Sequence, residues 1–139
     1  MDWNFDLDKL CAGQAIYVYA LKDLVRIEKV LKKNTNKIEK EIALKSKALI
    51  EKFYDEKLDL FISSDQYSYA SQIWVILAQI VDNKQGLKII NNIEKYDKAI
   101  NINSPYLYHH YIQALINLGE KKKAYNKMLE YSDDINMDY

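Results

Sequence analysis

Hydrophobic residues recur along this chain at the three- and four-residue spacings of α-helices, and they predict six helices. We expect these helices at about residues 8–31, 36–54, 64–81, 85–96, 105–118 and 120–131. The clearest start is Ser104-Pro105, a capping hydroxyl followed by proline at the first helical position. Ser64 or Asp65 is the expected cap of the third helix.

The predicted helices alternate in character. The first, third and fifth are apolar on nearly every side, whereas the second, fourth and sixth carry one apolar stripe among charged residues. This alternation predicts an all-α fold of three antiparallel hairpins in two layers, with inner helices covered by outer ones. Such layering is typical of α/α toroids and, less closely, of α-solenoids. We expect one domain over residues 1–131 and a frayed tail at 132–139.

Composition excludes several classes of function. The chain has 139 residues, with 20 basic and 20 acidic side chains, so no net charge draws it to nucleic acid or an anionic membrane. The apolar run 73–78, like every other in the sequence, is too short for a membrane span. A single cysteine excludes an internal disulfide and a cysteine-rich zinc site. Adjacent His109 and His110 point in different directions on a helix and cannot share a metal ion, so we expect no metal or cofactor. Without a membrane span or a disulfide, we expect a soluble cytoplasmic protein.

Antiparallel pairing places the starts of all three inner helices at one end of the domain. The segments 2–6, 63–67 and 101–106 therefore meet there, and they combine carboxylates, amides and hydroxyls with aromatic rings. Polar groups beside flat rings suit a carbohydrate. We expect Tyr67 and Tyr106 to contact sugar at this end.

Three stretches of the chain, in order, resemble the catalytic domain of bacterial α-L-rhamnosidases, the six-hairpin glycosidases of glycoside hydrolase family 78. The first is the opening Asp-Trp-Asn-Phe-Asp-Leu-Asp-Lys at 2–9 with Ala-Gly-Gln at 12–14. The second is Gln-Tyr-Ser at 66–68 with Ala-Ser-Gln at 70–72, and the third is Ser-Pro-Tyr-Leu-Tyr at 104–108. The resemblance covers nearly the whole chain.

The resemblance implies the second half of an (α/α)6 toroid, with three of its six hairpins, and a sugar bound where the inner helices begin. It adds Asp2 and Trp3 as sugar-contacting residues. Family members invert the configuration at the anomeric carbon of the sugar, and for this they need one carboxylic acid as general acid and one carboxylate as general base. The family's acid lies upstream of the Asp-Trp segment, and its base follows the last hairpin in a Trp-Glu motif that the tail 131–139 lacks. We therefore expect a fragment or truncated relative with no catalytic residue of its own, inactive as this isolated chain.

A tetratricopeptide-like scaffold for protein–protein interaction is the alternative. The stretch 115–120, followed by Ala124 and Tyr125, resembles part of that repeat. Its Leu-Gly pair does not recur at the required period of 34 residues, because Gln85-Gly86 stands at the corresponding upstream position.

Three hairpins cannot close a ring, so the end hairpins should expose apolar flanks. The first helix offers four residues: Ile16, Tyr19, Ala20 and Ile27. Large exposed apolar patches mark interfaces. We expect either a homodimer or association with the missing N-terminal half of the toroid.

Overall fold

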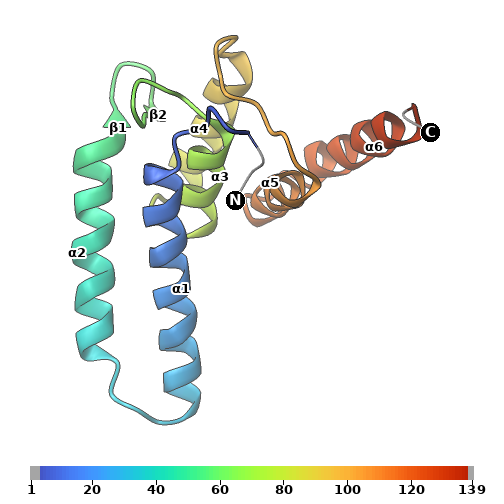
Figure 1. The fold of residues 1–139 in the computed structure, drawn as a ribbon. Coiled ribbons are helices and arrows are strands. Elements are labelled where there is room, and N and C mark those ends of the chain that lie inside the picture. Colours follow the sequence, from blue (N-terminus) through green and yellow to red (C-terminus); the bar gives the residue numbers. More distant parts are fainter. Residues whose placement is uncertain (1–3, 138–139) are drawn as a thin grey trace.

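The computed structural model describes residues 4–137, with the side chains of residues 4–133, and within these the fold is all-α (Figure 1). The six helices are α1 (Leu10–Val30), α2 (Asn36–Phe53), α3 (Tyr69–Leu77), α4 (Asn83–Lys95), α5 (Pro105–Asn117) and α6 (Lys121–Met137). Between α2 and α3, the two-residue strands β1 (Tyr54–Asp55) and β2 (Leu60–Phe61) form a small antiparallel hairpin.

The helices form the two layers that the sequence predicts. The inner helices α1, α3 and α5 stand in a row, with α3 in contact with both of the others. Each outer helix, α2, α4 or α6, packs against the inner helix that precedes it. This arrangement of three consecutive hairpins confirms the predicted fold class.

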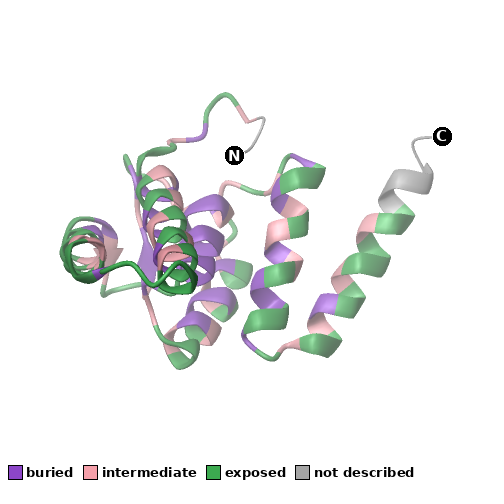
Figure 2. Ribbon diagram, turned by 90° about the horizontal axis from the view of Figure 1, so that it is seen from below, coloured by how far each residue is buried: buried purple, intermediate pink, exposed green. Residues whose placement is uncertain are grey.

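The core is centred on α3, where every residue from Ala70 to Leu77 is buried. Its neighbours contribute completely buried side chains from the other elements, among them Phe61, Ile89 and Leu115. Figure 2 shows the contrast with α6, which is exposed or half-buried over most of its described length. The hydrophobic core therefore ends at the last hairpin.

All three inner helices end in the same way. Lys32, Gln79 and Gly119 each follow the last turn with φ of 55°, 52° and 84°, respectively. In each case the backbone N–H groups of this residue and of the next one bond back to carbonyls of the last turn, as in a Schellman motif. Glycine occupies this left-handed position only at Gly119, so the sequence indicates only one of three equivalent helix ends.

The predicted start of α3 is wrong. Residues 63–66 form a tight turn in which Ser64 and Asp65 have φ of 46° and 64°, a conformation that cannot lead into a helix. The cap is Ser68, whose hydroxyl oxygen accepts the backbone N–H of Ser71 at 3.1 Å. The C-terminal boundary also differs, because α6 continues to Met137, past the predicted end at residue 131 and into the segment predicted as a frayed tail.

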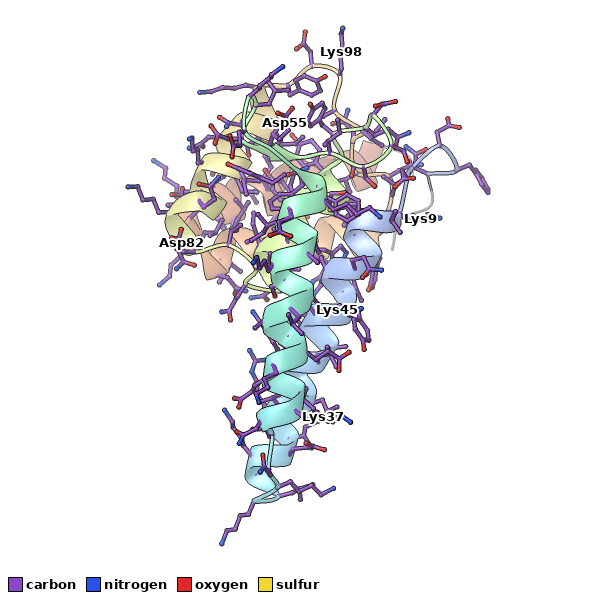
Figure 3. The ribbon with its side chains drawn as sticks, turned by 90° about the vertical axis from the view of Figure 1, so that its left-hand side faces the viewer. Lys9, Lys37, Lys45, Asp55, Asp82 and Lys98 are labelled. Carbon is purple, nitrogen blue, oxygen red and sulfur yellow. The ribbon has the colours of Figure 1, made fainter. Side chains whose placement is uncertain are left out.

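The α1–α2 hairpin is much longer than the next one. With 21 residues against 9, α1 runs about 31 Å and α3 about 14 Å. Lys22 marks where α3 ends, because its ammonium donates to the carbonyls of Ala78 and Gln79 at 2.6 and 2.9 Å. Beyond that point the hairpin projects as an arm, with Lys37 close to its tip (Figures 1 and 3).

Within the described part of the chain, no helix has the length and hydrophobicity that crossing a membrane requires.

Candidate functional site

The start of α1 is bonded to the turn before α3. The Asp8 carboxylate accepts the hydroxyls of Ser63 and Ser64, the latter at 2.8 Å. The Gln66 amide completes the link: its oxygen accepts the Asp8 backbone N–H at 2.8 Å, and its nitrogen donates to the Asp6 carbonyl at 2.7 Å. These bonds hold the Asp8 carboxylate in its charged form and lower its pKa, mainly through Ser63.

The loop before α5 joins the same end through the backbone. The N–H of Ile100 donates to the carbonyl of Tyr67 at 2.9 Å, and the N–H of Tyr69 donates to the carbonyl of Ile100 at 3.0 Å. The loops before all three inner helices are therefore connected at one end of the domain, as the antiparallel pairing predicts. Asp2 and Trp3, the two residues that the family resemblance adds to this end, lie outside the described residues.

Tyr67 is held by structural contacts on the outer side of this end. Its hydroxyl donates to Asp55 in β1, and its ring packs edge-on against Tyr96 at the end of α4, with centroids 5.0 Å apart. The hydrogen bond to Asp55, together with burial, raises the pKa of Tyr67 to about 12. A sugar hydroxyl at this position must therefore compete with Asp55 for the Tyr67 hydroxyl.

Tyr106 is the more accessible of the two predicted tyrosines. It lies in the first turn of α5 and is 50% exposed. Its ring packs edge-on against His110, with centroids 4.5 Å apart. Tyr67 and Tyr106 thus belong to two separate aromatic groups.

An aromatic strip continues from Tyr106 across the inner helices, although the sequence analysis did not identify it. His110 of α5 packs against Trp74 of α3 at 4.6 Å, and Trp74 packs edge-on against Tyr19 of α1 at 5.8 Å. Burial lowers the pKa of His110, which favours a neutral imidazole. The helical spacings of these residues carry no sign of the strip, because it forms only when the three helices stand side by side.

The indole of Trp74 is the most distinctive group in this aromatic strip. The side chain is only 4% exposed, and its N–H is the one buried side-chain polar atom of the described residues without a hydrogen-bond partner. A buried donor without an acceptor is costly. The inner helices therefore bring aromatic rings together in a strip, but the indole N–H of Trp74 lies beneath the surface of that strip and does not face solvent.

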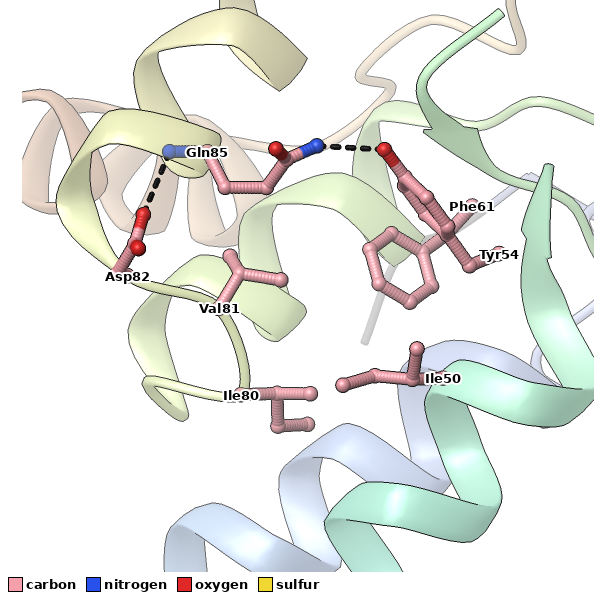
Figure 4. Close-up of a pocket in the computed structure, with 7 residues that line it drawn as sticks. All are labelled: Ile50, Tyr54, Phe61, Ile80, Val81, Asp82 and Gln85. Carbon is pink, nitrogen blue, oxygen red and sulfur yellow. Dashed lines mark hydrogen bonds between the residues drawn. The ribbon is translucent and has the colours of Figure 1, made fainter. Parts of the chain in front are cut away.

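A hollow lies on the outer side of the molecule, between α2 and α4 (Figure 4). Its polar groups bond to one another: Gln85 donates to the Tyr54 hydroxyl at 2.6 Å, and Tyr54 donates to Asp59 at 2.7 Å. Asp82 is occupied by capping α4 through the backbone N–H of Gln85. What remains is an apolar surface, formed in part by Phe61 and Ile80, without groups directed at a ligand.

The described residues do not assemble a recognisable catalytic group. They contain no cluster of three metal-ligating side chains. At the inner-helix starts, hydrogen bonds lower the pKa of both Asp8 and Asp55, so these carboxyls are ionised at neutral pH and unsuited to act as general acids. Burial raises the pKa of the Cys11 thiol to about 12, so it is not a nucleophile.

Comparison with known proteins relates the chain to a solved structure. No family model and no curated protein matches the sequence. A solved structure, a rhamnosidase from Klebsiella oxytoca with rhamnose bound, matches with a TM-score of 0.82 and 31% sequence identity. The match covers 91% of this chain and 25% of the rhamnosidase, so the chain spans about a quarter of that protein's length.

The match therefore joins a likeness in sequence, at 31% identity, to a likeness in fold, at a TM-score of 0.82. The likeness agrees with the resemblance that the Asp-Trp, Gln-Tyr-Ser and Ser-Pro-Tyr segments carry. The chain fits a fragment of a rhamnosidase.

Proposed function

We propose that this chain is a carbohydrate-binding fragment or truncated relative of an α-L-rhamnosidase-type glycoside hydrolase. The observation that carries the proposal is the match at 31% identity and a TM-score of 0.82 to a rhamnosidase with rhamnose bound. The aromatic strip on the inner helices supports it, because the half-exposed ring of Tyr106 at one end of the strip offers an aromatic face to a sugar.

The chain binds without hydrolysing. Inverting glycosidases need two carboxyl groups about 6.5–9.5 Å apart, one of them protonated at working pH. The resemblance places both of these groups outside this sequence. The carboxylates of Asp8 and Asp55 accept hydrogen bonds from hydroxyl groups, and these bonds favour their ionised form. Loss of a general acid alone removes about two to four orders of magnitude in rate.

The sugar lies at the inner-helix starts, against Tyr106 and the neighbouring strip, with Asp2 and Trp3 as further contacts. Tyr67 contributes less because Asp55 already holds its hydroxyl. With only part of a toroid around it, the sugar makes few contacts, and we expect a dissociation constant on the order of 1 mM.

A titration of isotope-labelled protein with L-rhamnose, followed by nuclear magnetic resonance, tests the proposal. We expect shifts around Tyr106 and His110, which Tyr106→Ala abolishes. Tyr125→Ala is the matched control, because Tyr125 is 60% exposed on α6 and lies outside the aromatic strip. Shifts at the opposite end, around Asn34 and Asp82, would contradict the placement, and an absence of shifts would favour the scaffold alternative.

An aryl α-L-rhamnoside provides the second test. We expect the pure chain to release no aryl product above the rate in buffer. Turnover that Asp8→Asn abolishes would show that the chain carries a working carboxylate, and the proposal of binding without hydrolysis would be wrong.

A further inference from the structure

One face of α4 carries a row of four polar side chains. They are spaced by three, four and three residues: Gln85, Lys88, Asn92 and Lys95. The first three bond to the Tyr54 hydroxyl at 2.6 Å, the Asp59 carboxylate at 2.7 Å and the Leu58 carbonyl at 2.9 Å, respectively. Figure 4 shows the first of these bonds. The row therefore fixes how the β hairpin lies against α4.

The last side chain of the row, Lys95, is not bonded in this way. It lines a hollow of about 400 Å³ between the β hairpin and α4, which we call the lysine hollow, together with Lys57, Lys88 and Tyr96. Neither Lys57 nor Lys95 forms a side-chain ion pair with another described residue. The lysine hollow thus contains two ammonium groups without a counter-ion.

The acidic residues around the lysine hollow do not supply this counter-ion. Asp59, the one acidic residue in its lining, is already bonded to Lys88. Asp55 accepts a tyrosine hydroxyl, and Glu56 and Asp97 are exposed and do not line the hollow. Three ammonium groups therefore face one carboxylate, and the excess positive charge favours an anion.

The lysine hollow does not lie at an open edge of the row of helices. Its lining comes from the segments 57–60 and 88–96, which belong to the β hairpin after α2 and to α4 with its C-cap. Both walls are therefore part of this chain, unlike the outer flanks of α1 and α5, where no further inner helix stands within the described residues.

We propose that the lysine hollow binds a phosphate group, either free or carried by a small molecule, between the ammonium groups of Lys57 and Lys95. A phosphate monoester carries close to two negative charges at neutral pH, which matches two unpaired ammonium groups. Lysine binds phosphate as a point charge. A hollow of about 400 Å³ is in the size range of small-molecule sites, so it leaves room beside Tyr96 for the rest of a phosphorylated molecule. This site is separate from the sugar contact proposed at Tyr106 and does not depend on it.

Nuclear magnetic resonance titrations of isotope-labelled protein with inorganic phosphate and with glucose 6-phosphate test the proposal. We expect amide shifts confined to 57–60 and 88–96, with a dissociation constant on the order of 1 mM. Glucose alone should give no shifts there. Tighter binding of glucose 6-phosphate would assign the site to a phosphorylated molecule, and equal affinity would assign it to free phosphate; both results support a phosphate site.

Variants and pH test which charges hold the anion. Lys57→Gln and Lys95→Gln should each raise the dissociation constant about two- to five-fold. Lys84→Gln is the matched control, because it removes the same charge from α4 outside the lysine hollow and should leave the affinity unchanged. The affinity should fall between pH 7.5 and pH 5, because phosphate loses one of its two charges near pH 6.

Three results would overturn the proposal. Acetate that binds as tightly as phosphate would indicate a site for a carboxylate. Phosphate shifts at the exposed lysines of the arm tip, such as Lys32 and Lys37, as large as those in the hollow would indicate non-specific attraction. Lys95 also lies in the last turn of α4, where a cation favours the helix dipole. If that is its whole role, Lys95→Gln would lower the melting temperature but leave the phosphate affinity unchanged.

Discussion

Two inner helices with the same apolar character meet different environments in this protein. On α3, all eight residues from Ala70 to Leu77 are buried, under α1 on one side, α5 on the other and α4 outside. On α1, which is more than twice as long, only five residues are buried. Its exposed side includes Ile27 at 58% and Val30 at 82%.

The two helices differ in burial because they have different neighbouring helices, and not because their sequences differ in hydrophobicity. A helix of this fold is covered when inner helices stand on both of its flanks, and α1 has such a neighbour on one flank only. An apolar residue at an edge position gains its free energy of burial only when a further helix arrives. Within the described residues, the exposed apolar side chains of α1 therefore lack this cover.

The largest expected effect comes from replacing one isoleucine with alanine in each of the two helices. Ile73→Ala on α3 removes a completely buried side chain and should lower the free energy of unfolding by about 2–5 kcal/mol. Ile27→Ala on α1 should lower it by less than about 0.5 kcal/mol in dilute, monomeric protein. Urea unfolding measures both. Equal losses would mean that α1 is buried as deeply as α3.

The next test concerns the first turns of the two helices. Gln72 of α3 is completely buried, and its amide bonds both the N–H and the carbonyl of Phe61 in β2, each at 2.8 Å. Gln72→Leu keeps the side-chain volume but leaves these two backbone groups without hydrogen-bond partners. It should lower the free energy of unfolding by about 1–3 kcal/mol. The matched control is Gln14→Leu on α1, where the side chain is exposed. A loss from Gln72→Leu no larger than that from Gln14→Leu would show that the β hairpin does not depend on the hydrogen bonds of Gln72.

A smaller effect is expected where α1 begins. Hydrogen bonds, the first from Ser63, lower the pKa of Asp8 below its ordinary 3.8. A carboxyl with a lowered pKa stabilises the fold above its unfolded-state pKa, and this contribution is lost as the pH falls through the folded-state value. Asp8→Asn should therefore cost about 1 kcal/mol at neutral pH and progressively less below pH 3.8. A difference that stays constant down to pH 2 would contradict the role of the charge.

The smallest effects should be equal in the two helices, because both end in the same motif. Gln79 after α3 and Lys32 after α1 hold φ of 52° and 55°, where glycine avoids the strain of a side chain. Gln79→Gly and Lys32→Gly should each raise the free energy of unfolding by about 0.5–1 kcal/mol. Thermal unfolding in parallel with wild type measures this, and a gain at one end alone would show that the two ends are not equivalent.

The alternation between helices that are apolar on nearly every side and helices with one apolar stripe is sufficient to predict the layers of this fold. The start of α5 is equally clear, since Ser104 caps the helix through the N–H of Leu107 and Pro105 follows. The β hairpin and the turn at 63–66 could not be predicted in the same way. Their left-handed residues, Asp59, Ser64 and Asp65, are not glycine, so the usual turn signal is missing.

The meeting of the loops before the inner helices was predictable from the sequence, but the aromatic strip was not. Antiparallel pairing alone brings the loops before the inner helices together, and the bonds between Asp8 and Ser63 or Ser64 show this contact. The aromatic strip through Trp74 and His110 has no sequence signal. It arises from three helices far apart in the chain, and it becomes visible only when they are placed side by side.

Hydrogen exchange of the backbone amides tests the central claim most directly, namely that α1 is an inner helix without its second neighbour. Peptides covering 69–77 and 23–31 report on α3 and on the free half of α1 in the same sample. We predict strong protection of α3 and weak protection of 23–31. Protection of 23–31 that equals that of α3 would contradict the account.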